Sequence, residues 1–186
     1  GRIYQNGGDN EKAMNCFVNA LESSASSYDH ITIARCFYSQ GTIYQYMYDW
    51  KKVIESNINA SNYFKSSNNV NSQFRSLLRA INGYSQLYDT NRASEIILQA
   101  NTLLSQVSFA NKGFYYATCI SFYSDNEMIE ELRSVLSEYI YNIPKERIDW
   151  ISVAYAYTIL NDYEMANSAI LNISGDQTTN ARYYAL

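Results

Sequence analysis

A fixed spacing of tyrosine and aspartate constrains the fold of this chain more than any other feature. Tyr4 is followed five residues later by Asp9, and the same pair returns 40 residues further on and again after a second step of 40. A small or aliphatic residue follows each aspartate after four positions, and an alanine after eleven. The matching columns are Tyr4, Tyr44 and Tyr84; Asp9, Asp49 and Asp89; Ala13, Val53 and Ala93; and Ala20, Ala60 and Ala100. Coincident columns of this kind indicate an array of similar units.

The pattern continues with a shorter step in the second half of the sequence. Asp125 lies 36 residues after Asp89, and Asp162 lies 37 residues after Asp125. The positions five residues before and four residues after these two aspartates are filled by Ile120, Tyr157, Ile129 and Ala166. The sequence therefore predicts five units.

Each unit has the pattern of two helices. Apolar residues recur at intervals of three and four both before an aspartate, as in "ITIARCFYSQGTIYQYM", and after it, as in "WKKVIESNINASNYF". The 186 residues include one proline and seven glycines, so residues that break helices are scarce. These observations predict an all-α protein.

The aspartates stand at the breaks between the paired helices. An aspartate there accepts a hydrogen bond from a free amide of the next helix and complements its dipole. We therefore predict that each lies within about two residues of a helix start. Ala13, Ala93 and Ala166 would be buried one turn inside the second helices, where a methyl group allows close packing. Gly1 and Gly41 would permit the same approach from the first helices.

These columns resemble the tetratricopeptide repeat (TPR) family, in which Gly and Tyr mark the first helix and Ala, Phe and Ala mark the second. The segment "GRIYQNGGDNEKAMNCFVNAL" carries Gly1, Tyr4, Ala13, Phe17 and Ala20 in these places. The segments "FYSQGTIYQYMYDWKKVIESNINA" and "WISVAYAYTILNDYEMANSAI" match less fully. The resemblance implies a TPR-like solenoid of antiparallel helix pairs in a right-handed superhelix. Its units would be 1–28, 29–68, 69–108, 109–143 and 144–175, with a sixth pair starting at 176–186.

Unit length and the two ends of the sequence depart from the usual pattern. A TPR unit has about 34 residues, and we expect the added length in lengthened helices and in loops around "SSASSYDH" and "FKSSNNVNS". Long units of this type look like TPR regions of bacterial regulators and membrane-anchored envelope proteins. The array lacks capping units at both ends, so we expect a fragment of a longer protein.

The resemblance also implies where a partner binds, because the first helices of TPR units line a concave groove. Carried over by column, the groove residues are Arg35, Tyr38, Thr42, Gln45, Arg75, Leu78, Arg79, Asn82, Phe114 and Thr118. Arg75 and Arg79 match the basic positions of TPR domains that clamp a C-terminal carboxylate. Ser39 and Thr42 depart from that clamp, so an ordinary solvated face is the alternative for the two arginines.

The residues that carry most enzyme chemistry are scarce. His30 is the only histidine, and it follows Asp29. The two residues are either an Asp–His pair for general-base catalysis or solvated residues near a helix cap. Cys16, Cys36 and Cys119 form no C-x-x-C motif, and we expect them to be unpaired, with Cys36 and Cys119 largely buried. We predict no catalytic residue, no metal site, no cofactor and no enzyme activity.

The sequence thus favours a non-enzymatic scaffold that binds a protein or peptide, with an acidic or C-terminal segment as its complement. The net charge of -4 disfavours nucleic acid as a partner, and no apolar run is long enough for membrane insertion. The alternative is a ligand- or signal-sensing TPR region of a larger bacterial regulator. The compartment would be the cytoplasm, or the periplasm if the region belongs to a membrane-anchored protein.

Overall fold

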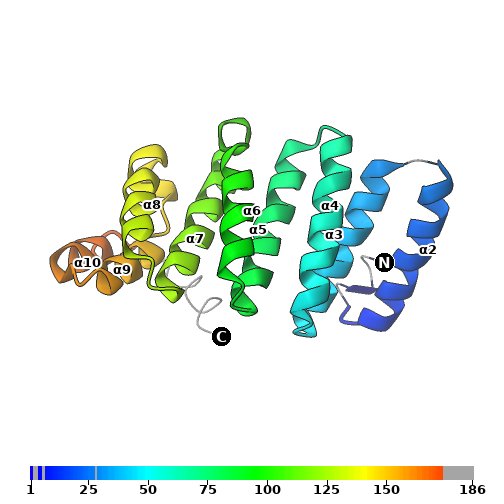
Figure 1. The fold of residues 1–186 in the computed structure, drawn as a ribbon, viewed down its shortest axis with the longest axis horizontal. Coiled ribbons are helices and arrows are strands. Elements are labelled where there is room, and N and C mark those ends of the chain that lie inside the picture. The colour runs from blue at the N-terminus through cyan, green and yellow to red at the C-terminus, as the bar shows by residue number, and fades with distance from the viewer. Residues whose placement is uncertain (2–3, 6, 28, 174–186) are drawn as a thin grey trace. The chain divides into compact units, whose positions relative to one another are not determined.

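The computed structural model describes residues 1, 4–5, 7–27 and 29–173, and within them helices are joined by turns and short connections (Figure 1). These residues form nine α-helices, two 3-10 helices and no strand, which confirms the all-α class. The α-helices are α2 (Asn10–Ser27), α3 (His30–Tyr46), α4 (Trp50–Ser66), α5 (Val70–Gln86), α6 (Thr90–Asn101), α7 (Phe109–Asp125), α8 (Ile129–Asn142), α9 (Trp150–Ile159) and α10 (Tyr163–Ile170). The 3-10 helices are η1 (Leu104–Gln106) and η2 (Lys145–Arg147).

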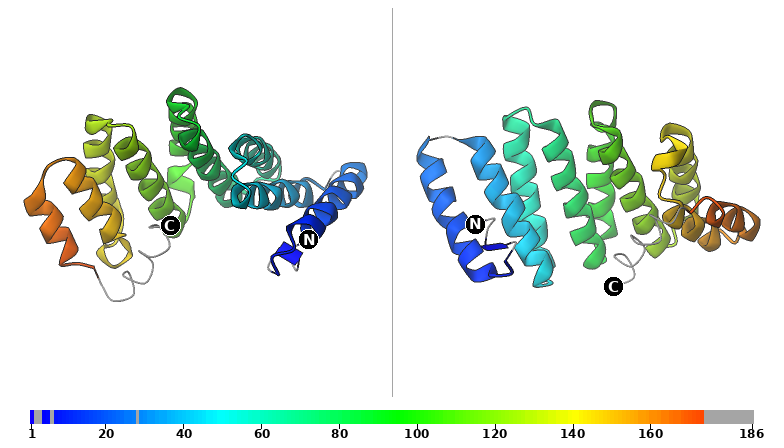
Figure 2. Two further views of the ribbon diagram at one scale, coloured as in Figure 1. Left: turned by 90° about the horizontal axis from the view of Figure 1, so that it is seen from below. Right: turned by 180° about the vertical axis from the view of Figure 1, so that it is seen from behind.

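The protein divides into two compact units, Gly1–Val107 and Ser108–Leu186. In the first unit each helix from α2 to α6 packs against the next in sequence (Figure 2). In the second, α7 packs against α8 and α9 against α10, while α9 also contacts α7 and α8. The helix start expected in 176–186 lies outside the described residues.

The five-residue spacing from tyrosine to aspartate is explained by the turn between α3 and α4. The amide of Asp49 donates to the carbonyl of Tyr44 at 3.0 Å, and the amide of Tyr48 donates to Gln45 at 3.1 Å. Tyr48 has a positive φ of 57°. This is the Schellman arrangement that closes a helix C-terminus. Asp49 then accepts the Lys52 amide on Oδ1 at 3.3 Å, so the same residue caps the start of α4.

The same turn recurs at other helix junctions. In each case an amide donates to the carbonyl five residues earlier, and the residue before that amide has a positive φ. The further donor–acceptor pairs are Asp9–Tyr4, Asn69–Phe64, Asp89–Tyr84, Met128–Tyr123 and Asp162–Tyr157. Because Asn69 forms this turn between α4 and α5, the connection there is short. The loop expected around "FKSSNNVNS" is thus a tight turn, and the added length of unit 29–68 lies in its helices. Longer connections do occur between α6 and α7 and between α8 and α9, and each contains a 3-10 helix.

Four of the five aspartates begin helices as predicted. Asp9, Asp49, Asp89 and Asp162 each directly precede a helix, and each accepts an amide hydrogen bond from three residues later.

The prediction for Asp125 is wrong, because α7 continues to that residue and α8 begins at Ile129. The turn lies three residues later in the sequence, where Met128 has no side-chain oxygen and makes no cap hydrogen bond. The buried position four residues after the cap is therefore filled by Leu132, which has no exposed surface, and not by Ile129.

The small residues of the repeat lie in close helix contacts. Ala13, Ala93 and Ala166 are buried, as predicted. A methyl group added at Gly41 would lie 2.5 Å from the Asn57 amide nitrogen, and one added at Gly1 would meet the ring of Phe17. The Phe17 and Asn57 side chains therefore pack directly against the glycine backbone, and a Cβ at either glycine would displace them.

Two tyrosines are among the largest fully buried side chains of the second unit. The rings of Tyr116 on α7 and Tyr139 on α8 are stacked with centroids 5.2 Å apart, and both are almost fully buried. The Tyr139 hydroxyl accepts a hydrogen bond from the Asp149 amide at 2.7 Å, and the Tyr116 hydroxyl accepts one from Asn142 at 3.4 Å. Tyrosine suits these positions because the ring packs while the hydroxyl meets a polar group.

Substitution of a buried alanine tests the helix contacts. We expect Ala93→Leu to lower the free energy of unfolding by about 1–3 kcal/mol, because α6 has no space for three further carbons at that point. Urea unfolding measures the change, with Glu95→Leu on an exposed position of the same helix as the control. An Ala93→Leu variant as stable as the control would show that the alanine column does not lie in a tight contact.

The capping carboxylates predict a pH dependence of stability. Hydrogen bonds from the Lys52 side chain and amide hold the pKa of Asp49 below its ordinary value of 3.8. The charged form therefore stabilises the folded state above pH 3.8, and this contribution is lost as the pH falls through the lower folded-state pKa. Asp49→Asn retains a cap without a titrating group. We expect the stability advantage of the wild type over this variant to shrink below pH 3.8. A difference that urea unfolding finds constant with pH would contradict this account.

Candidate functional site

The residues predicted to line a groove lie on three helices. Arg35, Tyr38, Thr42 and Gln45 are on α3; Arg75, Leu78, Arg79 and Asn82 are on α5; and Phe114 and Thr118 are on α7. The first two helices belong to the first compact unit and α7 to the second, so Phe114 and Thr118 are described with that unit alone.

Arg79, Tyr38 and Thr42 form one cluster that joins α3 to α5. The Arg79 guanidinium carbon lies 4.4 Å from the centroid of the Tyr38 ring. Nη1 of Arg79 donates to the Thr42 hydroxyl, and that hydroxyl donates to the Tyr38 carbonyl at 3.1 Å. Three residues that the sequence assigned to the groove are therefore in contact. Cation–π and hydrogen-bond contacts hold the guanidinium in one place.

The Arg79 contacts also set the register between the two helices. Because Arg79 reaches both Tyr38 and Thr42, the position one helical turn earlier on α5 is level with the position one turn earlier on α3. These positions hold Arg75 and Arg35, and both side chains are exposed. Three arginines thus lie near one another on this face of the first unit. We call Arg35, Arg75 and Arg79 the arginine cluster.

The arginine cluster is locally cationic on a protein of net charge -4. Among the described residues, the ion pairs within 4.0 Å are Asp9–Lys12, Asp49–Lys52 and Asp89–Arg92, so none involves the cluster. The nearest carboxylate on α3 is its cap, Asp29, whose pKa is lowered mainly by the hydrogen bond from Thr32 and to a smaller degree by the charge of Arg35. The cluster is therefore available to an anionic ligand.

The other predicted groove residues differ in their surroundings. Gln45, Asn82 and Phe114 are exposed, and Phe114 shows 53% of its surface. Leu78 is buried with 5% exposed, so it packs in the core instead of lining a groove. The Tyr38 ring also differs from expectation, because the guanidinium of Arg79 covers it. That ring supports Arg79 and does not offer its whole face to a ligand.

A shallow depression that the sequence did not predict lies between the helix junctions of the first unit. Its lining residues are Lys51, Ile54, Tyr84, Leu87, Asp89 and Arg92. They come from the start of α4, the end of α5 and the start of α6. The repeat could have predicted this depression, because equivalent turns of successive units lie at one edge of the array.

The structure gives the Asp29–His30 pair a structural role. The Asp29 carboxylate accepts the Thr32 amide at 3.1 Å and caps α3. The His30 ring meets Tyr63 edge to face, with centroids 5.6 Å apart. Among the residues that the structure describes, no group of three or more His, Cys, Asp or Glu side chains is placed to hold a metal ion.

Comparison with known proteins adds no relative: no protein-family model matches the sequence, and neither a curated protein nor a solved structure matches it. Among the described helices, none combines the length and apolar character needed to cross a membrane.

The environment of the cysteines predicts their reactivity. All three are free; Cys36 and Cys119 are buried as expected, and Cys16 is partly exposed. Burial raises the pKa of Cys36, and it raises the pKa of Cys119 to about 12. Since the thiolate is the reactive form, a thiol reagent at neutral pH should label Cys16 first and the other two only after unfolding. Rapid labelling of all three in the native protein, compared with a denatured control, would contradict their burial.

Proposed function

We propose that this protein is a non-enzymatic scaffold that binds a protein or peptide on the face formed by α3 and α5. The proposal includes a TPR-like solenoid, in which stacked antiparallel helix pairs form a right-handed superhelix. The repeated turn supports it, because the same hydrogen bonds connect successive helices. The buried alanines support it too, since they give the paired helices the same close contact in several units.

The arginine cluster is the observation that carries the proposal. Arg79 is held between α3 and α5 by Tyr38 and Thr42, while Arg35 and Arg75 remain exposed beside it. An arginine that is fixed before binding loses less conformational freedom when a ligand arrives. The cluster combines one such fixed cation with two adaptable ones.

The chemistry of arginine defines the ligand. Its forked donors form paired hydrogen bonds with a carboxylate, and such bonds are stronger than neutral ones. An acidic segment or the C-terminal carboxylate of a partner is therefore the ligand that this face would select. The overall negative charge would repel an acidic ligand elsewhere on the surface and would favour its binding at the cluster.

Removing the exposed arginines tests this function. A hexapeptide array with free C-terminal carboxylates identifies ligands, and calorimetry then measures their affinities. We expect Arg35→Ala combined with Arg75→Ala to weaken binding by at least about tenfold, because each charge-assisted hydrogen bond contributes about 1.5–3 kcal/mol. The melting temperature should barely change, since both side chains are exposed.

A matched control removes the same charge from another helix. Lys51→Ala combined with Lys65→Ala changes two exposed lysines on α4 and should leave the affinity close to that of the wild type. Arg79→Ala should lower both affinity and stability, because it also breaks the link between α3 and α5. Unchanged affinity in the Arg35/Arg75 variant would refute the assignment of this face.

A further inference from the structure

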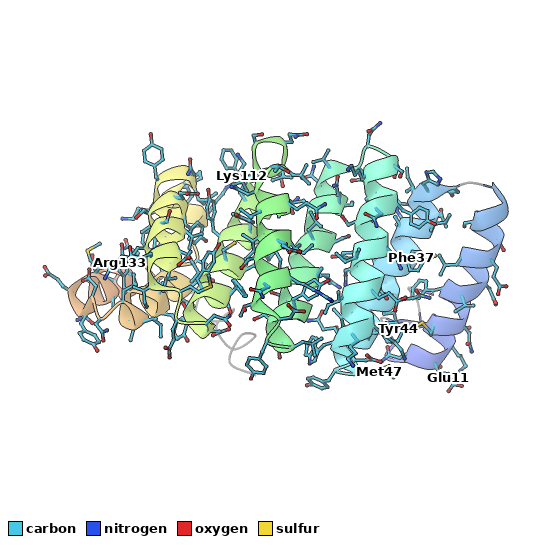
Figure 3. All side chains as sticks on the ribbon, in the orientation of Figure 1. Glu11, Phe37, Tyr44, Met47, Lys112 and Arg133 are labelled. Atoms are coloured by element: carbon cyan, nitrogen blue, oxygen red, sulfur yellow. The ribbon has the colours of Figure 1, made fainter. Side chains whose placement is uncertain are left out.

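Large apolar side chains gather at one edge of the first unit, away from the arginine cluster. They lie in the α3–α4 and α5–α6 turns, which share the lower edge in Figure 1, where Figure 3 labels Met47. The exposed fractions are 69% for Tyr46, 62% for Met47, 75% for Tyr48, 40% for Leu87 and 86% for Tyr88. We call these five residues the turn patch. The depression described above lies beside these turns, and Leu87 is the residue that it shares with the turn patch.

Two residues of the turn patch are unfavourable for the backbone that carries them. Tyr48 and Tyr88 have φ values of 57° and 56°. A bulky side chain is disfavoured in this left-handed region, where glycine or asparagine is usual. The equivalent positions of the other described turns hold Gly8, Asn68, Glu127 and Asn161, so an aromatic side chain is found here at Tyr48 and Tyr88 alone among these turns. The Tyr48 ring meets the Trp50 ring edge to face, with centroids 6.0 Å apart, yet Tyr48 remains 75% exposed and Tyr88 86% exposed. Burial within the folded monomer therefore offsets little of the backbone cost.

Ion pairs neutralise most of the charge at this edge. Asp49 pairs with Lys52 at 3.2 Å, and Asp89 pairs with Arg92 at 3.5 Å. The exposed Lys51 adds one further cation, so the edge carries little net charge. A second copy of the protein, although it also has a net charge of -4, meets little like-charge repulsion here.

We propose that the turn patch is the interface between two copies of this protein. Its two halves are near copies of each other, "YQYMYD" at 44–49 and "YSQLYD" at 84–89. A two-fold axis between them would place the first turn of one copy against the second turn of the other. Such an interface uses the same surface on both subunits and closes after two copies.

The area of the turn patch indicates how tightly two copies would associate. The exposed parts of the three tyrosines amount to roughly 350–570 Å², taking about 150–250 Å² for a whole side chain. Even with Met47 and Leu87 added, the patch stays below the roughly 800 Å² per partner of a standard interface and lies in the range of weak, transient complexes. A reversible dimer that forms at micromolar concentration is the expected result.

Sedimentation equilibrium of the 186-residue protein tests the proposal. The wild type should show a concentration-dependent dimer. Tyr48→Asn combined with Tyr88→Asn should raise the dissociation constant at least about tenfold. The same variant should raise the melting temperature of the monomer, because asparagine fits the left-handed backbone better than tyrosine. Loss of association together with a gain of stability is a result that general unfolding cannot produce.

Two further variants complete the experiment. Tyr141→Asn changes a tyrosine that is 89% exposed on α8 and should leave the dimer unchanged. Met47→Lys combined with Leu87→Lys leaves both left-handed residues in place and should also abolish the dimer through charge repulsion. A wild type that stays monomeric at every concentration, or a dimer that persists in both patch variants, would overturn the proposal. The proposal would also be overturned if the protein stayed monomeric and bound a different protein through the turn patch.

Discussion

The hydrogen bond from the amide of one residue to the carbonyl five positions earlier organises this structure. At Asp49 the backbone amide closes α3, while the carboxylate accepts a hydrogen bond from the Lys52 amide in the first turn of α4. Because one residue serves both helices, the connection cannot lengthen without the loss of one of these bonds. The direction in which α4 leaves the turn is therefore set by local geometry, and the contacts of Val53 and Gly41 with the neighbouring helix follow from it.

This dependence explains which parts of the fold could be predicted from the sequence. The turns at Asp9, Asp49, Asp89 and Asp162 were visible because a side-chain oxygen marks each cap. Met128 forms the same backbone bond to Tyr123 without such an oxygen. The nearby Asp125 has the carboxylate that Met128 lacks, so the sequence pattern places the cap three residues too early. Asn69 was missed for another reason, since a run of Ser and Asn has the composition of a loop even where it forms a tight turn.

The candidate site was predictable in its residues but not in its contacts. The repeat assigned Arg79, Tyr38 and Thr42 to one face, and the structure brings them together. The stacking of Arg79 on Tyr38 depends on the register between α3 and α5, which the spacing in the sequence does not supply. Leu78 shows the same limit: it is adjacent in sequence to Arg79, yet the helix turns by about 100° per residue and places it in the core.

The face of α3 and α5 and the turn patch are governed by different constraints. A side chain on a helix face must suit the packing of its neighbours, so Arg79 both links two helices and presents a cation. A turn makes no such demand beyond its backbone angles, and Gly8, Asn68 and Asn161 satisfy those angles without strain. Tyr48 and Tyr88 satisfy them less well, and both stay largely exposed even though the Tyr48 ring meets the edge of Trp50. Two large apolar side chains that fit their backbone poorly and remain in solvent favour a contact outside the monomer, and for this reason the turn patch carries the inference of a second copy.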